Sequence, residues 1–427
     1  MSYVEKLVCR WCGKEYKFED GPLTCATEGC LGRLEVHYDY EKIGGKLTRQ
    51  VVESRRERGF IRYIELMPLE SDGPIVTLYE GGTPLIHAKK LGEKIGLRNL
   101  YLKDESRNPT GSFKDRPISV GANRGLQLGY KVTVTASSGN AAASLAAHSA
   151  RMGMACVAFV PEHVSPGKAA QLQQYGARVI RVSGLEKGED PTVKMMKITY
   201  EKYQWYPCPS FGPFNPYQSE GTKTMAYETA EQLGWRVPDW VFLQVGGGGL
   251  LLGNWKGYLE LECLGFTDKL PRIVAVQSTG CMPVVRAYKE KMHPHRIKPW
   301  ERPDTVASGI EDPYPWDGDS VLEALEKSNG TAVEVTDEEI IETCKALAKT
   351  EGIFTTPTGG AGLAGIVKLF REGYIDRDEV VFTAITETGL KEPEIFYKEV
   401  GMPPLIEPRM EMLEDIISKG NFFTNKM

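Results

Sequence analysis

Three turns of the sequence combine glycine or small polar residues with groups that could hold a ligand. They lie at 108–116 (NPTGSFKDR), 137–140 (SSGN) and 246–250 (GGGGL). Each turn precedes a helix-like run and adjoins a strand-like run, and ligands bind at such turns in open parallel sheets. We therefore expect a functional site where the three turns meet.

The run of four glycines at 246–249 has the chemistry of a phosphate cradle. Without Cβ atoms, backbone N–H groups can converge on an anion, and the positive end of a following helix adds to the attraction. The run matches neither GxxxxGK[ST] nor GxGxxG, so nucleoside triphosphate and dinucleotide sites lose their main support. The alternative interpretation is a tight packing turn without a ligand.

Lys114 lies at the predicted start of a helix, after Pro-Thr-Gly-Ser. The partial positive charge of a helix N-terminus disfavours an ammonium group and lowers its pKa. A neutral amine can attack an aldehyde, which is how lysine is used in pyridoxal phosphate (PLP) chemistry. The alternative is a solvated surface lysine.

Four of the nine cysteines form two knuckles near the N-terminus, Cys9 with Cys12 and Cys25 with Cys30. Two cysteine pairs separated by a hairpin-sized spacer are typical of a tetrahedral structural zinc site, and in a reducing compartment a metal is favoured over disulfides. The alternative is a small β-ribbon with four unligated cysteines. All four positions would be protein ligands, so we expect a structural role.

The elements that must position these groups alternate between strand and helix. Strand-like runs occur at 130–136, 155–160, 177–182, 240–245, 272–277 and near 379–386, with helical patterns between most of them. Such alternation predicts an α/β fold with parallel sheets and right-handed crossovers. We expect a further helix at 337–352, a glycine-rich bend at 357–365 (PTGGAGLAG), a surface loop near 293–305 and a helical acidic tail.

Composition excludes several classes of protein. The 427 residues include 41% hydrophobic and 26% charged residues, which is ordinary globular usage. The net charge is -5, so no overall field attracts nucleic acid or an anionic membrane. The sequence has no long apolar run, and MSYVEKLVCR lacks the apolar core of a secretion signal. We expect a cytoplasmic protein with no membrane or nucleic-acid partner.

The string LKDESRNPTGSFKDRPISVGAN closely resembles the lysine motif of threonine synthases, which have the tryptophan-synthase-β-like (type II) fold of PLP enzymes. The resemblance extends over residues 78–400. It is supported in chain order by EGGTPL, TASSGNAAAS, NPYQSEGTKTMAYE, the four glycines, EGIFTTPTGGAGLAG and TETGLKEP. It implies a PLP enzyme that acts on a small amino acid, and a homodimer, which is common in the fold.

The resemblance also implies roles for single residues. It makes Lys114 the lysine that carries the cofactor and later the general base, with Phe113 beside it. Asn140 would bind the cofactor's phenolic oxygen and Thr386 its pyridine nitrogen; a neutral Thr there favours elimination and replacement over transamination. The predicted phosphate loop is Gly246, Gly247, Gly248, Gly249 and Leu250, and the predicted substrate site includes Ser137, Ser138, Gly139 and Gln218.

The sequence departs from the family pattern at the substrate site. Gln218 stands where these enzymes typically have an arginine that binds the substrate's phosphate. Lys223 and Arg116 are the nearby cations in sequence that could replace it. We expect a threonine synthase that converts O-phosphohomoserine and water to threonine and phosphate. The alternative is an enzyme of β-elimination or β-replacement on serine, threonine or an O-phosphoserine-like amino acid.

The expected architecture is therefore a type II PLP-enzyme fold of two α/β domains with open, mostly parallel twisted sheets. A zinc-ribbon-like extension covers residues 1–40. The large PLP-binding domain takes residues 41–114 and 221–427, and a small mobile domain takes residues 115–220.

Overall fold

A computed structural model describes residues 2–137, 139–162, 164, 166–184 and 190–419. The chain divides into two compact units, Met1–Lys391 and Glu392–Met427. The first contains all three sheets of the described residues. The second contains two helices, α15 (Pro393–Val400) and α16 (Met410–Lys419).

The largest sheet has six strands in the order β12-β11-β10-β13-β5-β4. All neighbouring strands are parallel except β4 and β5, which pair antiparallel at one edge. The strands are β4 (Leu85–His87), β5 (Asn99–Asp104), β10 (Trp240–Gln244), β11 (Arg272–Ser278), β12 (Thr331–Val335) and β13 (Val380–Ile385).

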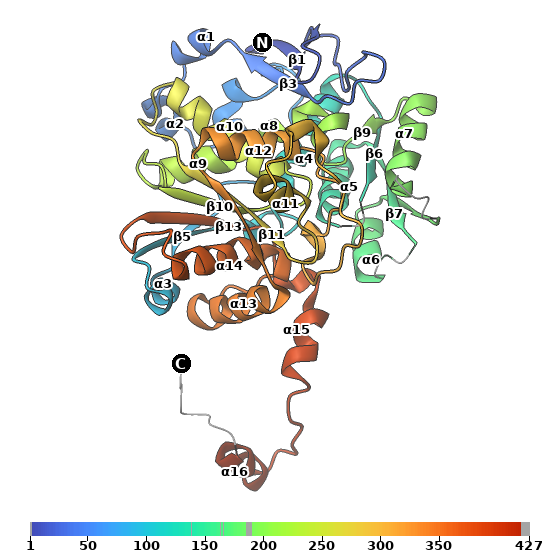
Figure 1. Cartoon of the computed structure of the whole chain (residues 1–427). Helices are drawn as coiled ribbons and strands as arrows, with labels where there is room; N and C mark the ends of the chain where they lie inside the picture. The colour runs from blue at the N-terminus through green and yellow to red at the C-terminus, as the bar shows by residue number, and fades with distance from the viewer. Residues whose placement is uncertain (1, 138, 163, 165, 185–189, 420–427) are drawn as a thin grey trace. The chain divides into compact units, whose positions relative to one another are not determined.

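The central strand of this sheet is buried on both faces. Every residue of β10 (WVFLQ) is buried, so the strand lacks the alternation of a half-exposed strand, as expected when helices cover both faces of a parallel sheet. Figure 1 shows α13 and α14 on one face and α10 and α12 on the other. The carboxyl ends of the parallel strands consequently meet at one edge.

A second sheet has four parallel strands in the order β8-β7-β6-β9. The strands are β6 (Val132–Ala136), β7 (Ala155–Pro161), β8 (Arg178–Val182) and β9 (Tyr206–Pro207). It lies wholly within residues 115–220, the range predicted for a small domain, and the mobility of that domain stays a prediction.

The N-terminal segment forms a three-stranded antiparallel ribbon in the order β2-β1-β3. Its strands are β1 (Val4–Cys9), β2 (Glu15–Tyr16) and β3 (Leu34–Tyr38). Leu7, Leu34 and Val36 point into the main hydrophobic core rather than into a core of their own. The ribbon is therefore packed as part of the first unit.

Fourteen α-helices complete the described part of the first unit, and none of them is long and apolar enough to cross a membrane. They are α1 (Tyr40–Gly44), α2 (Arg49–Ser54), α3 (Lys89–Ile95), α4 (Asp115–Gln127), α5 (Asn140–Met152), α6 (Pro166–Gln174), α7 (Pro191–Tyr203), α8 (Pro216–Thr222), α9 (Thr224–Gln232), α10 (Gly249–Cys263), α11 (Pro283–Lys289), α12 (Gly318–Lys327), α13 (Asp337–Glu351) and α14 (Pro357–Arg371).

One expected element is wrong. The glycine-rich stretch at 357–365 is not a bend but the first half of α14, capped by the Thr356 hydroxyl. Its glycines allow the helix to lie against the sheet: a Cβ on Gly362 would come within 2.3 Å of Thr383 Oγ1, and one on Gly365 within 2.7 Å of Val276. Close packing of helix on sheet accounts for the glycines here.

A buried ion-pair network fixes the first turn of α4. The guanidinium of Arg116 donates to both carboxylate oxygens of Glu105, at 2.7 and 2.8 Å, and to both oxygens of Glu228, at 2.8 Å each. Lys103 Nζ adds an ion pair to Glu228 at 2.8 Å. None of the four side chains is more than 4% exposed. Bidentate geometry compensates the desolvation of these charges and ties α4 to β5 and α9.

We expect Arg116→Met to lower the free energy of unfolding by about 3–5 kcal/mol, because it leaves two buried carboxylates with reduced compensation. Arg98→Met is the matched control, since the Arg98–Asp378 pair has side chains 59% and 63% exposed and should contribute less than about 1 kcal/mol. Urea unfolding measures both variants. Equal, small losses would contradict a structural role for the network.

Candidate active site

Lys114 is the residue immediately before α4 and lies at the carboxyl edge of the large sheet. The N–H of the preceding Phe113 donates to the carbonyl of Thr386 at 2.9 Å, which ties the lysine turn to the end of β13. The Lys114 Nζ lies 4.9 Å from the centroid of the Phe113 ring and donates to Ser210 Oγ at 2.6 Å. The amine is thus held in place from two sides.

The amine of Lys114 is surrounded by acidic side chains but is mostly withdrawn from water. Burial lowers the pKa of Lys114 to about 8, although Asp312, Asp317 and Glu387 act in the opposite direction. Burial likewise raises the pKa of Asp312 to about 7. At pH 7 about a tenth of the Lys114 amine is then neutral, far more than for a lysine with the ordinary pKa of 10.5, and the neutral form is the one that a nucleophile or general base requires.

The four glycines form the turn between β10 and α10. Gly248 has φ +108°, a left-handed conformation that favours glycine. A Cβ would meet Asp312 Oδ2 at 3.3 Å on Gly247 and Asp317 Cβ at 3.0 Å on Gly248. The first N–H groups of α10 have no partner within the helix, so the loop offers backbone donors behind a turn with no room for side chains.

Thr386 follows β13 at the edge of the large sheet, and Asn140, which begins α5 after β6 of the second sheet, is bonded across to the neighbouring Glu387. Asn140 Nδ2 donates to Glu387 Oε2 at 2.5 Å, and Thr356 Oγ1 donates to Glu387 Oε1 at 2.6 Å. The Thr386 hydroxyl is buried and accepts from Gln244 Nε2 at 3.0 Å. An amide nitrogen carries two N–H donors, so Asn140 retains one beyond the bond to Glu387.

The predicted substrate turn joins β6 to α5. Gly139 precedes the first residue of α5, and its N–H donates to Ser137 Oγ at 3.2 Å. The turn therefore presents a hydroxyl and a helix N-terminus, which together suit a carboxylate. Ser138 lies outside the described residues.

Gln218, in α8, lies behind Ser210 rather than directly beside Lys114. Its Oε1 accepts from the Ser210 N–H at 2.6 Å, while its Nε2 is buried without a partner among the described residues. Ser210 has φ +69°, a conformation that non-glycine residues rarely adopt. The chain Gln218–Ser210–Lys114 thus links the residue predicted from sequence to the amine.

Sequence reasoning missed several residues of this site. Ser210, Asp312 and Asp317 come from irregular segments or helix starts that no motif marks. Glu387 directly follows Thr386 within a quoted motif, so it could have been named with its neighbour. These residues are far apart in sequence and meet only in the folded protein, so no spacing in the sequence indicates them.

The four N-terminal cysteines also converge. Their sulfur atoms all lie within 4.8 Å of one another. Cys9 Sγ is 3.6 Å from Cys30 Sγ, and Cys12 Sγ is 3.5 Å from Cys25 Sγ. The knuckles predicted from sequence therefore meet in a single cluster at one end of the ribbon.

Comparisons with known proteins agree with this geometry. Residues 76–387 match the family described as pyridoxal-phosphate dependent enzyme. The chain is 41% identical to a threonine synthase of Methanocaldococcus jannaschii over 96% of this chain and 99% of that protein. It is 37% identical to a threonine synthase of Methanosarcina acetivorans over 96% of this chain and 98% of that protein.

The chain belongs to the threonine synthase family of PLP-dependent enzymes. A solved structure, the processed form of threonine deaminase isoform 2 from Solanum lycopersicum, has the same fold, with a TM-score of 0.63 and 21% identity over 75% of this chain and 88% of that one. The family-level predictions of a type II PLP-enzyme fold and a PLP-dependent lyase are confirmed.

The residues present fit the family's cofactor. Lys114 offers an amine whose pKa is lowered to about 8, and the glycine loop offers backbone N–H groups with no Cβ in the way. Thr386 offers a buried, neutral hydroxyl. Two carboxyl groups, Asp312 and Asp317, lie against the same loop and would oppose the binding of an anion there.

We expect the rate at which cofactor-free protein forms its covalent link to PLP to rise about tenfold per pH unit below pH 8 and to level off above it, because only the neutral amine attacks. The rise in visible absorbance after mixing measures this rate. Lys114→Ala is the control: it should form no link and lose about 10²-fold or more of turnover. A profile centred at the ordinary lysine pKa of 10.5 would contradict the assignment.

Proposed function

We propose that this protein is a threonine synthase, which converts O-phosphohomoserine and water to threonine and phosphate. The observation that carries the proposal is the 41% identity to a threonine synthase over nearly the full length of both chains. Lys114, Thr386 and the glycine loop at the carboxyl edge of the large sheet, with Asn140 bonded to Glu387 there from the second sheet, support it.

Lys114 is the proposed general base. When bound, PLP supplies an electron-withdrawing ring that accepts the negative charge left when a proton leaves the substrate's Cα. The neutral amine of Lys114 takes that proton and becomes an ammonium, which the carboxylates of Asp312, Asp317 and Glu387 stabilise. Ser210 Oγ, at 2.6 Å from Nζ, orients the amine.

The turn before α5 is the proposed site for the substrate's α-carboxylate. Ser137, Ser138, Gly139 and the helix N-terminus at Asn140 supply neutral donors there. Asn140 and Thr386 are proposed to hold the cofactor ring, with Phe113 beside Lys114. Gly246, Gly247, Gly248, Gly249 and Leu250 are proposed to hold the cofactor's phosphate.

The substrate's own phosphate raises a problem of charge. Arg116 is committed to Glu105 and Glu228, and Lys223 Nζ bonds Glu260 at 2.9 Å and the Leu66 carbonyl at 2.9 Å. Neither cation is available to replace the arginine that Gln218 lacks. Gln218 Nε2 offers only neutral donors, and an uncompensated buried charge is costly.

This observation favours a second candidate function. An enzyme that eliminates or replaces an uncharged or smaller β-substituent, as on serine or threonine, would not need a cation at Gln218. The first steps at Lys114 would be the same, so only the leaving group separates the two functions.

We expect Gln218→Arg to separate them when it is assayed beside wild type on O-phosphohomoserine, serine and threonine. If wild type forms threonine and phosphate efficiently, neutral donors suffice and threonine synthase is established. If wild type instead releases keto acid from serine or threonine, and Gln218→Arg gains about tenfold or more in threonine formation, the second function holds. Failure on all three substrates would contradict both.

We further propose that Cys9, Cys12, Cys25 and Cys30 bind one structural zinc ion. The support is their sulfur cluster, with all four atoms within 4.8 Å, and the preference of zinc for four thiolates in structural sites. Reduced cysteines also suit the proposed cytoplasmic location.

We expect one zinc per chain by metal analysis of the purified protein, and Cys12→Ser to lower both zinc content and melting temperature, because metal binding contributes to folding of the ribbon. Cys263→Ser is the control, since Cys263 is also exposed but lies outside the cluster. A metal-free wild-type protein with four freely titratable thiols in the ribbon would contradict the site.

We also propose a homodimer, as is common in the fold, and a mobile small domain at residues 115–220 beside a large domain at 41–114 and 221–427. The separate four-stranded sheet within 115–220 supports this division.

A further inference from the structure

Two carboxylates lie against the loop proposed to hold the cofactor's phosphate. Asp317 Oδ2 lies 3.6 Å from the Cβ position of Gly249, and the Asp317 N–H donates to the Gly247 carbonyl at 2.8 Å. Asp312 Oδ2 lies 3.3 Å from the Cβ position of Gly247. An anionic phosphate in this loop would face both carboxyl groups at short range, and the ionised form of either repels it strongly because water is largely excluded.

The N-terminal ribbon supplies the cation that meets one of them. Arg33 Nη1 donates to Asp317 Oδ1 at 3.2 Å, and Arg33 Nη2 donates to Ser320 Oγ at 3.2 Å. Arg33 is 7% exposed and Asp317 2%. A buried carboxylate paired with a guanidinium presents far less negative charge to its surroundings than an unpaired one.

The path of Arg33 to this position is specific. Its side chain passes over Gly212, where a Cβ would come within 2.1 Å of Arg33 Cδ and 2.4 Å of Asp317 Oδ1. The backbone of Arg33 is fixed to the first knuckle, because its carbonyl accepts from the Arg10 N–H at 3.0 Å. This bond holds the backbone of Arg33 beside the cysteine cluster.

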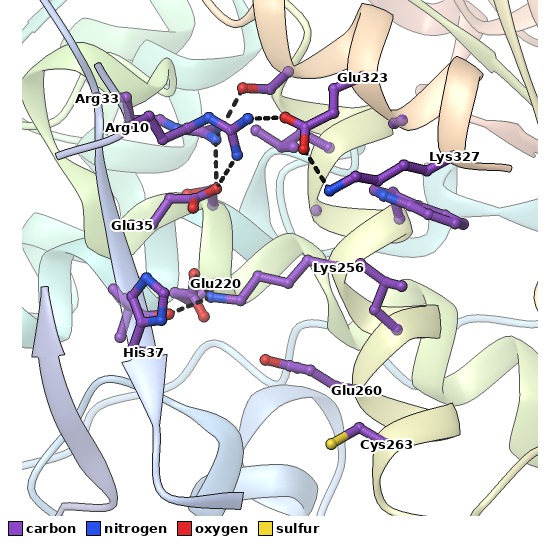
Figure 2. A pocket seen from close by; sticks show the side chains of 18 of the residues that line it. Arg10, Arg33, Glu35, His37, Glu220, Lys256, Glu260, Cys263, Glu323 and Lys327 are labelled. Atoms are coloured by element: carbon purple, nitrogen blue, oxygen red, sulfur yellow. Dashed lines mark hydrogen bonds and ion pairs between the residues drawn. The ribbon is translucent and has the colours of Figure 1, made fainter. Parts of the chain in front are cut away.

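On its other side Arg33 borders a cavity of about 520 Å³ between the ribbon and helices α8, α10 and α12. Figure 2 shows Arg10 and Arg33 at one end of this cavity, both directed at Glu35, with Arg10 also bonded to Glu323. Arg10 thus shares the ribbon and the cavity with Arg33 but pairs with carboxylates away from the glycine loop.

We propose that Arg33 is a positioning residue of the cofactor site: by pairing with Asp317 it neutralises the carboxylate behind the glycine loop and allows the loop to accept the phosphate of PLP. The inference rests on the proposed placement of that phosphate. It makes the cysteine ribbon, which carries no reacting group, a contributor to cofactor affinity.

Titration of cofactor-free protein with PLP, followed by visible absorbance, tests the proposal. We expect Arg33→Gln, which removes the charge but retains hydrogen-bond donors, to weaken PLP binding about tenfold or more. Asp317→Asn should bind PLP a few-fold more tightly than wild type, because it removes a negative charge behind the loop while the guanidinium of Arg33, still paired with Glu35, remains. The double variant should return to within about threefold of wild type, since the two effects are coupled.

Two comparisons separate charge from general structural damage. Pyridoxal, which lacks the phosphate, should bind wild type and Arg33→Gln equally, and Arg10→Gln should bind PLP like wild type. An Arg33→Gln variant that binds PLP normally, or a double variant that is not restored, overturns the proposal. If Arg33→Gln does not fold, Asp317→Asn decides with pyridoxal as its control, because loss of Asp317 also favours the neutral Lys114 amine and would tighten the binding of both compounds alike. An Asp317→Asn variant whose preference for PLP over pyridoxal is no greater than that of wild type overturns the proposal.

If the phosphate of PLP does not bind in the glycine loop, the experiment gives a different result. If wild-type protein binds pyridoxal as tightly as PLP, the glycine loop does not hold the phosphate, and the proposed function of the loop fails first. The Arg33 variants are informative only when wild type prefers the phosphorylated compound, so the two failures are distinguishable.

Discussion

The buried ion-pair network of Arg116 is the interaction on which the site depends. Two residues after Lys114, this guanidinium joins α4 to Glu105, the residue after β5, and to Glu228 in α9. Because charges so deeply buried tolerate only one arrangement, the first turn of α4 has a single position relative to the sheet. That position places the Lys114 amine at the carboxyl edge, within hydrogen-bond distance of Ser210.

Around this amine, buried groups of opposite charge compensate one another; each of them alone would be unfavourable in the low-polarity interior. Burial disfavours an ammonium at Lys114, while three carboxylates favour one, and the outcome is a pKa of about 8. Two of these carboxylates, Asp312 and Asp317, would repel a phosphate at the glycine loop, and at Asp317 the ribbon supplies a compensating cation. The acidic side chains thus favour proton transfer at Lys114. The repulsion that Asp317 would exert on an anion is reduced by Arg33, which comes from the N-terminal ribbon.

Local patterns were sufficient to predict much of the fold. The strands β6, β7, β8, β10, β11 and β13 fall where runs of β-branched and aromatic residues placed them, and the four cysteines converge as their spacing indicated. The stretch at 357–365 was misjudged because its glycines serve close packing within α14, a reason that exists only once the sheet is present.

The residues of the site likewise fall into those with a local sequence signal and those without one. Lys114 and the glycine loop carry local signals, namely a helix start and a run without side chains. Ser210, Asp312, Asp317 and Arg33 carry none, because their importance comes from contacts with segments far away in sequence. The resemblance to a family supplied the cofactor, which residue chemistry at Lys114 alone had left open.

The order of strands in the large sheet has a consequence for how the protein is made. β13 lies between β10 and β5, so the pair β4–β5 joins the rest of the sheet only through residues 380–385. During synthesis, the edge of β5 that pairs with β13 therefore has no partner strand until nearly the whole chain has left the ribosome. Folding of this unit is completed late, and a nascent chain that ends before β13 has a divided sheet.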